Sequence, residues 1–308
     1  MKGRWQRFVS FCAVTEDATA LAVTRIVMGT TLFFHMLMCL CNGTTTTVFV
    51  NAAHGGLNNV AWARDWATPT GAVLLTVSTA LCGLLVAVGW FTRPALFGAW
   101  IGVRICSALS HRAHGGSDAL FIDVLFVLLL SGCGNTLSMD ARRAGTSTAL
   151  RLPRLLLVFQ LGLLYFFGGL QKLSWGWVPG GDATALWFAL HQPQWTRFDG
   201  LPPHWTYVLT QVGTTSAWLF EITAPLLLLA VALDELGSVG RVARLLRRLQ
   251  VRWLYLAYGA LMHIGIKVLI EVGPYLPVTL SMYPAVLGPV VCARILRIQR
   301  VSDAGERR

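Results

Sequence analysis

The stretch Tyr165-Phe-Phe-Gly-Gly-Leu-Gln-Lys172 ends a long apolar run in a lysine, and Trp175 and Trp177 follow closely. Its two glycines allow another backbone to come near, and the two indole rings can form flat apolar walls. A lysine withdrawn from water among aromatic rings loses part of its preference for the charged form, so it can act as a base. The alternative is a lysine that extends its ammonium group to the headgroups at a membrane surface. These residues alone leave both interpretations open.

Three ionisable residues, His263, Lys267 and Glu271, follow one another at intervals of four. In a helix this spacing places them on one face, over about 12 Å at 1.5 Å per residue. Such a stripe cannot face lipid, because a polar group at membrane depth needs a partner or a cavity. The pattern predicts either a Lys267–Glu271 pair that holds helices together beside a satisfied His263, or a face that handles protons or binds a ligand.

A buried carboxylate is expected at Glu221, four residues before Pro225. The proline removes the backbone donor that would serve the carbonyl of Glu221, so a kink is predicted beside the carboxylate. Arg25, deep in the first apolar stretch, needs a carboxylate or backbone carbonyls as partners. Glu221 is one possible partner, and a structural clamp is the favoured role for the arginine.

A metal site is not predicted. His111 and His114 have the spacing His-x-x-His, but a third clear ligand is missing, and Asp118 is expected to cap the helix that follows. The seven cysteines form no CxxC pair and are interpreted as small packing residues.

The composition predicts an all-α, polytopic integral membrane protein. Hydrophobic residues make up 55% of the 308 residues and charged residues only 13%, which is too much apolar surface for one aqueous core. The net charge of +11 is therefore interpreted as a topology signal and not as a sign of nucleic-acid binding. Eight apolar stretches have about the length that a bilayer requires, namely 18–40, 70–90, 94–109, 118–133, 153–170, 207–233, 253–270 and 275–292.

The distribution of basic residues predicts that both termini are cytoplasmic. With eight spans in that orientation, most of the 25 lysines and arginines fall on the inner side, as the positive-inside rule requires. The basic link 241–252 would then lie at the inner leaflet. The expected organisation is one multi-pass domain of the cell membrane over residues 1–300, followed by a short polar tail, 301–308.

Five short stretches, in order along the chain, resemble the HTTM family, the membrane domain shared with vitamin K-dependent gamma-glutamyl carboxylase and with SdpB-like proteins of bacterial antimicrobial-peptide systems. They are Ala22-Val-Thr-Arg-Ile-Val-Met-Gly29, Leu137-Ser-Met-Asp140, Tyr165 to Gly180, Phe220-Glu-Ile-Thr-Ala-Pro225 and Met262-His-Ile-Gly-Ile266. The resemblance covers nearly the whole chain.

The resemblance implies roles for specific residues. Lys172 falls on the lysine that serves the carboxylase as the base for reduced vitamin K, and His263 falls on a histidine of the carboxylase membrane domain. His114 lies about three residues from the position that a further functional histidine of the carboxylase would occupy. A reduced, vitamin K-like quinone is therefore the implied cofactor.

The chain also departs from the carboxylase, which has a large lumenal portion after its membrane domain. Peptide capture is thus expected to need a soluble partner protein, and carboxylation itself is not predicted. One hypothesis is a quinol-using or peptide-modifying membrane enzyme with an outward-facing pocket, in contact with membrane lipid. Its catalytic residues would be Lys172 and His263, and its pocket would include Trp175, Trp177, His114, Glu221, Lys267 and Glu271. The other hypothesis is a non-catalytic membrane component for the maturation, export or immunity of a small secreted peptide.

Overall fold

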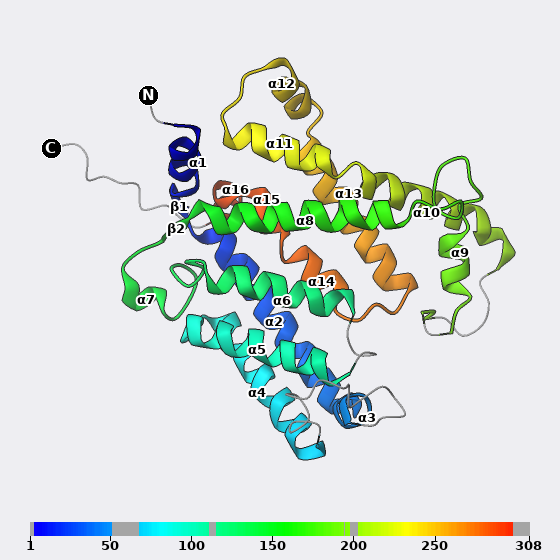
Figure 1. Cartoon of the computed structure of the whole chain (residues 1–308), viewed down its shortest axis with the longest axis horizontal. Coiled ribbons are helices and arrows are strands. Elements are labelled where there is room, and N and C mark those ends of the chain that lie inside the picture. Colours follow the sequence, from blue (N-terminus) through cyan, green and yellow to red (C-terminus); the bar gives the residue numbers. More distant parts are fainter. Residues whose placement is uncertain (1–2, 51–67, 111–114, 194, 198–202, 298–308) are drawn as a thin grey trace. The chain divides into compact units, whose positions relative to one another are not determined.

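The computed structural model describes residues 3–50, 68–110, 115–193, 195–197 and 203–297, and almost all of its regular structure is helical (Figure 1). The chain divides into two compact units, one formed by residues 1–157 with 277–308 and the other by residues 158–276. Helix α8 (Arg151–Gln171) runs from the first unit into the second.

The first unit contains long helices joined by short elements. Its helices are α1 (Arg4–Cys12), α2 (Thr19–Cys41), α3 (Thr44–Val50), α4 (Pro69–Val88), α5 (Thr92–Leu109), α6 (Gly116–Leu129), α7 (Ala141–Ala144), α14 (Tyr275–Leu280), α15 (Tyr283–Leu287) and α16 (Pro289–Ile295). A small antiparallel pair, β1 (Thr15–Asp17) and β2 (Thr148–Leu150), sets Glu16 opposite Ala149. The sequence did not predict these two strands.

Helices α2 and α4 pack with their backbones in contact. A Cβ on Gly29 would lie 2.5 Å from the backbone nitrogen of Ala87, and one on Gly83 would lie 2.9 Å from that of Phe33. Since both clashes would involve backbone atoms, only glycine allows this close approach.

The buried guanidinium of Arg25 binds backbone carbonyls where α4 ends. It donates to the carbonyl oxygens of Val86, Ala87, Cys133 and Leu137, at distances of 2.7, 3.2, 3.2 and 2.6 Å. The carbonyls satisfy the donors that burial removes from water. The predicted role of Arg25 as a structural clamp is confirmed, and the alternative partner, Glu221, is bound elsewhere.

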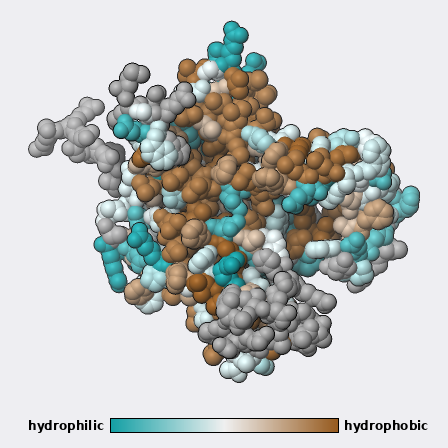
Figure 2. Space-filling view, viewed as in Figure 1, coloured by the Kyte–Doolittle hydropathy of each residue, from teal (hydrophilic) through white to brown (hydrophobic). Residues whose placement is uncertain are grey.

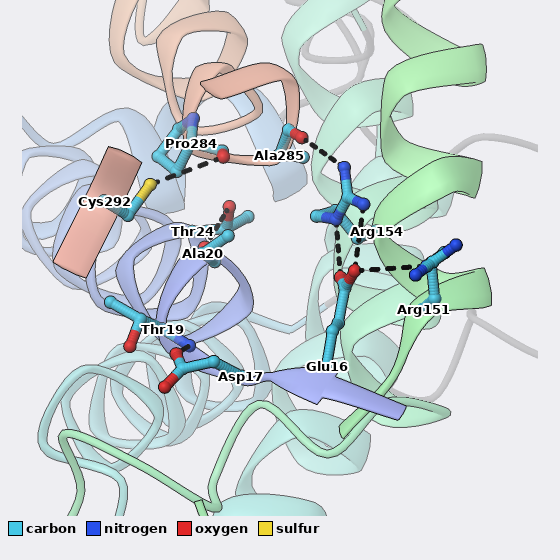
Figure 3. A network of polar contacts seen from close by, with 10 residues as sticks. All are labelled: Glu16, Asp17, Thr19, Ala20, Thr24, Arg151, Arg154, Pro284, Ala285 and Cys292. Carbon is cyan, nitrogen blue, oxygen red and sulfur yellow. Dashed lines mark hydrogen bonds and ion pairs between the residues drawn. The ribbon is translucent and has the colours of Figure 1, made fainter. Parts of the chain in front are cut away.

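A second buried arginine, Arg154, ties the start of α8 to the N-terminal strand (Figure 3). Its Nε and Nη2 donate to the two carboxylate oxygens of Glu16, at 2.5 and 2.9 Å, and its Nη1 donates to the carbonyl of Ala285 at 3.2 Å. Arg151 contacts the same carboxylate at 3.5 Å. Arg154 is thus a buried structural group and not an exposed basic residue.

The second unit contains the rest of α8 together with the helices of the C-terminal half. They are α9 (Ala185–Leu190), the 3-10 helix η3 (His204–Thr206), α10 (Tyr207–Ile222), α11 (Pro225–Glu235), α12 (Arg241–Arg248) and α13 (Val251–Leu269). The predicted kink near Glu221 is confirmed, because α10 ends at Ile222 and Pro225 begins α11.

Among the described residues, four helices are long and apolar enough to cross a membrane. They are Thr19–Cys41, Pro69–Val88, Arg151–Gln171 and the joined pair His204–Glu235. The predicted stretches 94–109, 118–133 and 253–270 also form helices, α5, α6 and α13, whose passage across a membrane stays a prediction. Hydrophobic residues cover much of the face seen in Figure 2, and many large apolar side chains are exposed, Phe34, Leu74, Phe97, Phe159 and Leu261 among them.

The eighth predicted stretch, 275–292, is not one straight helix. It forms α14, α15 and α16, and the segment Tyr275–Leu287 meets Pro289–Ile295 at a bend of 108°. Pro284 and Pro289 stand at the beginnings of α15 and α16, and Gly288 between them has a φ of 80°. Each proline removes a helical donor, so the apolar run breaks where the prolines lie.

Candidate functional site

Lys172 and Glu221 form an ion pair within the second unit. Lys172 directly follows α8, and its Nζ lies 2.5 and 2.6 Å from the two carboxylate oxygens of Glu221, in the last turn of α10. The side chains are 29% and 11% exposed. Neither interpretation of Lys172 from the sequence included this partner: a carboxylate on the neighbouring helix binds the ammonium group.

The predicted close approach at the glycines of α8 is confirmed, and it creates the ion pair. A Cβ on Gly169 would lie 2.8 Å from the backbone nitrogen of Ile222, so α8 and α10 touch there. Gly168 faces the carboxylate itself, since its added Cβ would be 3.6 Å from Oε1 of Glu221. The indole nitrogen of Trp218 donates to the carbonyl of Gly169 at 3.1 Å and fixes the same contact.

Only one of the two predicted tryptophan walls lies at Lys172. The ammonium nitrogen is 5.0 Å from the centroid of the Trp177 ring, within the range of a cation–π interaction. Trp175 is 69% exposed and so does not enclose the lysine. The chain between α8 and α9 is a series of turns in which residues two apart need not share a side, and the sequence pattern could not show this.

His263 lies inside the second unit against Tyr165 of α8. Its Nε2 and the tyrosine hydroxyl are 2.9 Å apart, and the histidine is 2% exposed. The other ring nitrogen, Nδ1, is buried and has no hydrogen-bond partner among the described residues. If the Tyr165 hydroxyl donates to Nε2, then Nδ1 carries the proton of the neutral ring and is a buried donor.

The predicted polar stripe on α13 is wrong in part. The helix ends at Leu269, so Glu271 lies beyond it, and Lys267 and Glu271 are both partly exposed. The Lys267–Glu271 pair itself is present, at 3.2 Å, and Arg197 pairs with the same carboxylate. The predicted ion pair is therefore present, but it joins residues 195–197 and not a second helix to the end of α13, through Arg197 and the bridge between Thr196 and Ile270. His263 is interior as predicted but not fully satisfied, because its Nδ1 has no hydrogen-bond partner among the described residues.

Hydrogen bonds keep Glu271 in its ionised form. Partial burial acts to raise the pKa of this carboxyl, but the ammonium of Lys267, the backbone N–H of Gly273 and the charge of Arg197 together lower the pKa below its ordinary value. This cluster is therefore a stable surface ion network.

A family model described as HTTM domain matches residues 14–239 of the chain. The chain belongs to the HTTM domain family. No curated protein matches it. No solved structure matches it either. The family match, together with the long apolar helices, identifies a membrane protein.

The HTTM match includes Tyr165, Lys172 and Glu221, whereas His263 lies after its last residue. Tyr165 begins the stretch from Tyr165 to Gly180 that resembles the family, but the sequence predicted no role for it. The signal was present in the spacing, because Tyr165 and Lys172 are seven residues apart, which is close to two helical turns. The structure brings both to the side of α8 that meets α10, where the Tyr165 ring lies 4.7 Å from that of Phe220.

Two further predicted site residues of the HTTM chain, Lys267 and Glu271, pair with each other and not with Lys172. His114, together with His111, lies outside the described residues. Asp118 accepts a hydrogen bond from the backbone N–H of Gly115 at 2.9 Å, so its predicted role at the start of a helix is confirmed. Within the described ranges, no group of three or more histidine, cysteine, aspartate or glutamate side chains could hold a metal ion.

The arrangement supplies two polar pairs, Lys172–Glu221 between the end of α8 and α10, and Tyr165–His263 between α8 and α13. The first pair can exchange a proton between an amine and a carboxylate, and the second between a phenol and an imidazole. Lysine, glutamate, tyrosine and histidine side chains are all among the groups that can act as general acids or bases.

Proposed function

We propose that this HTTM protein is a quinol-using or peptide-modifying enzyme of the cell membrane, with eight spans, cytoplasmic termini and an outward-facing pocket. The observation that carries the proposal is the contact of Lys172 with Glu221 beneath the Trp177 ring. Lys172 directly follows the candidate span Arg151–Gln171, and Glu221 lies within the candidate span His204–Glu235, so a lipid-soluble substrate can enter from the bilayer.

The proposed topology rests on charge and on helix position. Besides the four long apolar helices, three of the predicted spans are occupied by the helices α5, α6 and α13. Together with the broken segment α14 to α16 they bring the number of crossings to eight, an even number that returns the C-terminus to the side of the N-terminus.

In the proposed chemistry, a proton moves within the ion pair before it moves from the substrate. Transfer from Nζ of Lys172 to the carboxylate of Glu221 gives a neutral amine and a carboxylic acid. The neutral amine then accepts the hydroxyl proton of a bound quinol, which leaves a quinol anion beside the new ammonium group. Trp177 provides an aromatic face against which the quinol ring can stack.

His263 and Tyr165 support this site in the proposal. The buried Nδ1 of His263 is a donor for a quinol oxygen, and Tyr165 holds the ring in the tautomer that leaves Nδ1 protonated. A vitamin K-like quinol, with two oxygens on a flat apolar ring system, has the required acceptors and shape.

The second candidate is a non-catalytic membrane component for the maturation, export or immunity of a small secreted peptide. Lys172 is 29% exposed, so part of its ammonium group can bind an anionic group of such a peptide. A soluble partner protein would then present the peptide.

Replacement of Lys172 separates the two candidates. Lys172→Arg keeps the positive charge and the pair with Glu221, but arginine does not act as a base near neutral pH. We expect Lys172→Arg to abolish turnover of a reduced naphthoquinone by the protein in liposomes, while its binding to anionic peptides is retained. Full turnover in Lys172→Arg would refute the assignment of the base.

The mass of secreted peptides gives an independent test. Peptides from cells with the intact protein and from cells with Lys172→Arg are compared by mass spectrometry. A covalent change seen only with the intact protein supports the enzyme, and a gain equal to the mass of carbon dioxide identifies carboxylation. Identical peptide masses, together with peptide export that Lys172→Arg retains, favour the non-catalytic component.

A further inference from the structure

Helix α12 (Arg241–Arg248) has two distinct exposed faces. At 100° per residue, Val242, Leu245 and Leu249 lie along one side, and their side chains are 55%, 54% and 52% exposed. The arginines lie on the next side of the helix. Ala243, which is 2% exposed, faces the rest of the unit. The apolar side is thus left without a covering element among the described residues.

The arginines of this segment differ in their partners. Asp234 accepts from Arg247 at 3.1 Å and from Arg252 at 3.3 Å, so one carboxylate binds two of the cations. Arg241, Arg244 and Arg248 have no ion pair in the part of the chain that the structure describes. Three positive charges therefore border the exposed apolar side of α12.

The position of α12 along the chain is equally specific. The candidate membrane span His204–Glu235 ends six residues before Arg241, and α13 begins three residues after Arg248. The residues between the span and α12 include Leu236 and Val239, which are 66% and 81% exposed. A helix that follows a span so closely lies at the depth of the headgroups, because the link is too short to carry it far into water.

We propose that α12 lies flat on the membrane and binds anionic phospholipid headgroups through Arg241, Arg244 and Arg248. Val242, Leu245 and Leu249 enter the boundary between headgroups and acyl chains, and the arginine stems extend so that the guanidinium groups reach lipid phosphates. Because the charges are complementary, the affinity of α12 for anionic lipid should exceed its affinity for zwitterionic lipid by roughly fivefold for each arginine near the surface. In Figure 2, hydrophilic residues project at the place of α12 beside hydrophobic surface.

This binding surface is independent of the proposed chemistry at Lys172, and it lies after the residues that the family model matches. It concerns the link between two membrane helices, so it adds a lipid preference to the protein and not a further step of a reaction.

The test uses the full chain in lipid nanodiscs, made either of phosphatidylcholine alone or of phosphatidylcholine mixed with an equal part of phosphatidylglycerol. Amide hydrogen exchange is followed by mass spectrometry over residues 236–250. We expect exchange in α12 to be slower in the discs that contain phosphatidylglycerol. In the double variant Arg241→Gln/Arg248→Gln most of this difference should be lost, because the preference for anionic lipid falls by roughly fivefold for each arginine removed.

A matched control removes the same charge elsewhere. Arg142 and Arg143 of α7 are exposed, so Arg142→Gln/Arg143→Gln lowers the net charge equally and should keep the effect of phosphatidylglycerol on α12. Equal exchange in the two kinds of disc would overturn the proposal, as would a full lipid effect in Arg241→Gln/Arg248→Gln.

A measurement on the intact protein guards against a variant that folds poorly. In roughly 1 M NaCl the screening length falls to about 3 Å, so the difference between the two lipids should shrink while the apolar contribution remains. A lipid difference that is unchanged by salt would show that charge does not cause it.

Discussion

A Cβ atom on Gly169 would lie 2.8 Å from the backbone nitrogen of Ile222, whereas one on the adjacent Gly168 would lie at an ordinary contact distance of 3.6 Å from the carboxylate of Glu221. The two neighbouring glycines therefore make different contacts with α10. Gly169 allows the backbones of α8 and α10 to touch, and this contact places the carboxylate of Glu221 within reach of Lys172.

The two glycines give a matched pair of variants. Gly169→Ala should lower stability by about 1–3 kcal/mol, because the new methyl group meets backbone atoms that cannot move aside. Gly168→Ala should be neutral or slightly stabilising, since alanine is the better helix former and its Cβ has room. Thermal unfolding of both variants in detergent measures the difference. Equal melting temperatures would contradict the close contact.

The hydrogen bond between Tyr165 and His263 predicts an effect on protonation as well as on stability. Tyr165→Phe keeps the ring but leaves Nε2 of the buried histidine without its partner, which should cost about 1–3 kcal/mol. Tyr258→Phe is the control, because its ring also packs against Phe220 and no hydrogen bond of its hydroxyl is found among the described residues.

The protonation of His263 provides the second readout for Tyr165→Phe. Nitrogen chemical shifts of the labelled histidine ring report which nitrogen carries the proton, and the variant should shift the tautomer population relative to Tyr258→Phe. A structural role alone would lower stability and leave these shifts unchanged.

The sequence was sufficient to predict most of the long helices. The apolar runs at 18–40, 70–90 and 153–170 correspond to α2, α4 and α8 within one or two residues at most ends, because a long apolar run in a membrane protein has few alternatives to a helix. Pro225 likewise predicted the break between α10 and α11. Pro284 and Pro289 act in the same way, so the stretch 275–292, predicted as one span, is broken into α14, α15 and α16.

The candidate site was predictable only in part. The glycines and tryptophans near Lys172 in the sequence indicated that this lysine is a candidate site residue. Its partner, however, depends on which helix contacts Gly169, and no local sequence pattern contains that information. His263 was assigned with Lys267 and Glu271 because of their spacing, although α13 ends before Glu271. The nearest helix stop signal in the sequence, Gly273-Pro274, comes only after Glu271, and periodicity alone does not mark the earlier end at Leu269.

Asp140 predicts a dependence of stability on pH. Its carboxylate accepts the backbone N–H groups of Phe91 and Thr92, at 3.2 and 2.7 Å, and the Thr92 hydroxyl at 2.7 Å. Burial acts to raise the pKa of Asp140, but these hydrogen bonds and the charge of Arg143 lower it below its ordinary value.

The sign of the pH effect follows from the lowered pKa of Asp140. The ionised carboxylate stabilises the fold above an unfolded-state pKa of about 3.9, and this contribution is lost as the pH falls through the lower folded-state pKa. Asp140→Asn should therefore be less stable than the wild type at neutral pH, and the gap should narrow on acidification. Denaturation in detergent between neutral and acidic pH measures the gap; a constant gap would exclude the ionised group as its cause.

The ion pair between Glu16 and Arg154 should be one of the most sensitive points of the fold. Glu16→Gln leaves the guanidinium of Arg154 buried without a counter-charge, at a cost of about 3–5 kcal/mol. Asp17→Asn is the adjacent control, because among the described residues Asp17 accepts the backbone N–H of Thr19 at 2.8 Å, and an asparagine oxygen can accept the same bond, so this variant should cost less than about 1 kcal/mol.

A double variant tests whether the cost of Glu16→Gln comes from the unpaired charge. Glu16→Gln/Arg154→Met removes the buried cation along with its partner, and should recover much of the stability that Glu16→Gln loses, since an apolar pair avoids the desolvation of an ion. Unfolding free energies of the two single variants and the double variant complete the cycle. If the double variant is less stable than Glu16→Gln, the packing of Arg154 and its bond to Ala285 stabilise the fold more than the charge pair does.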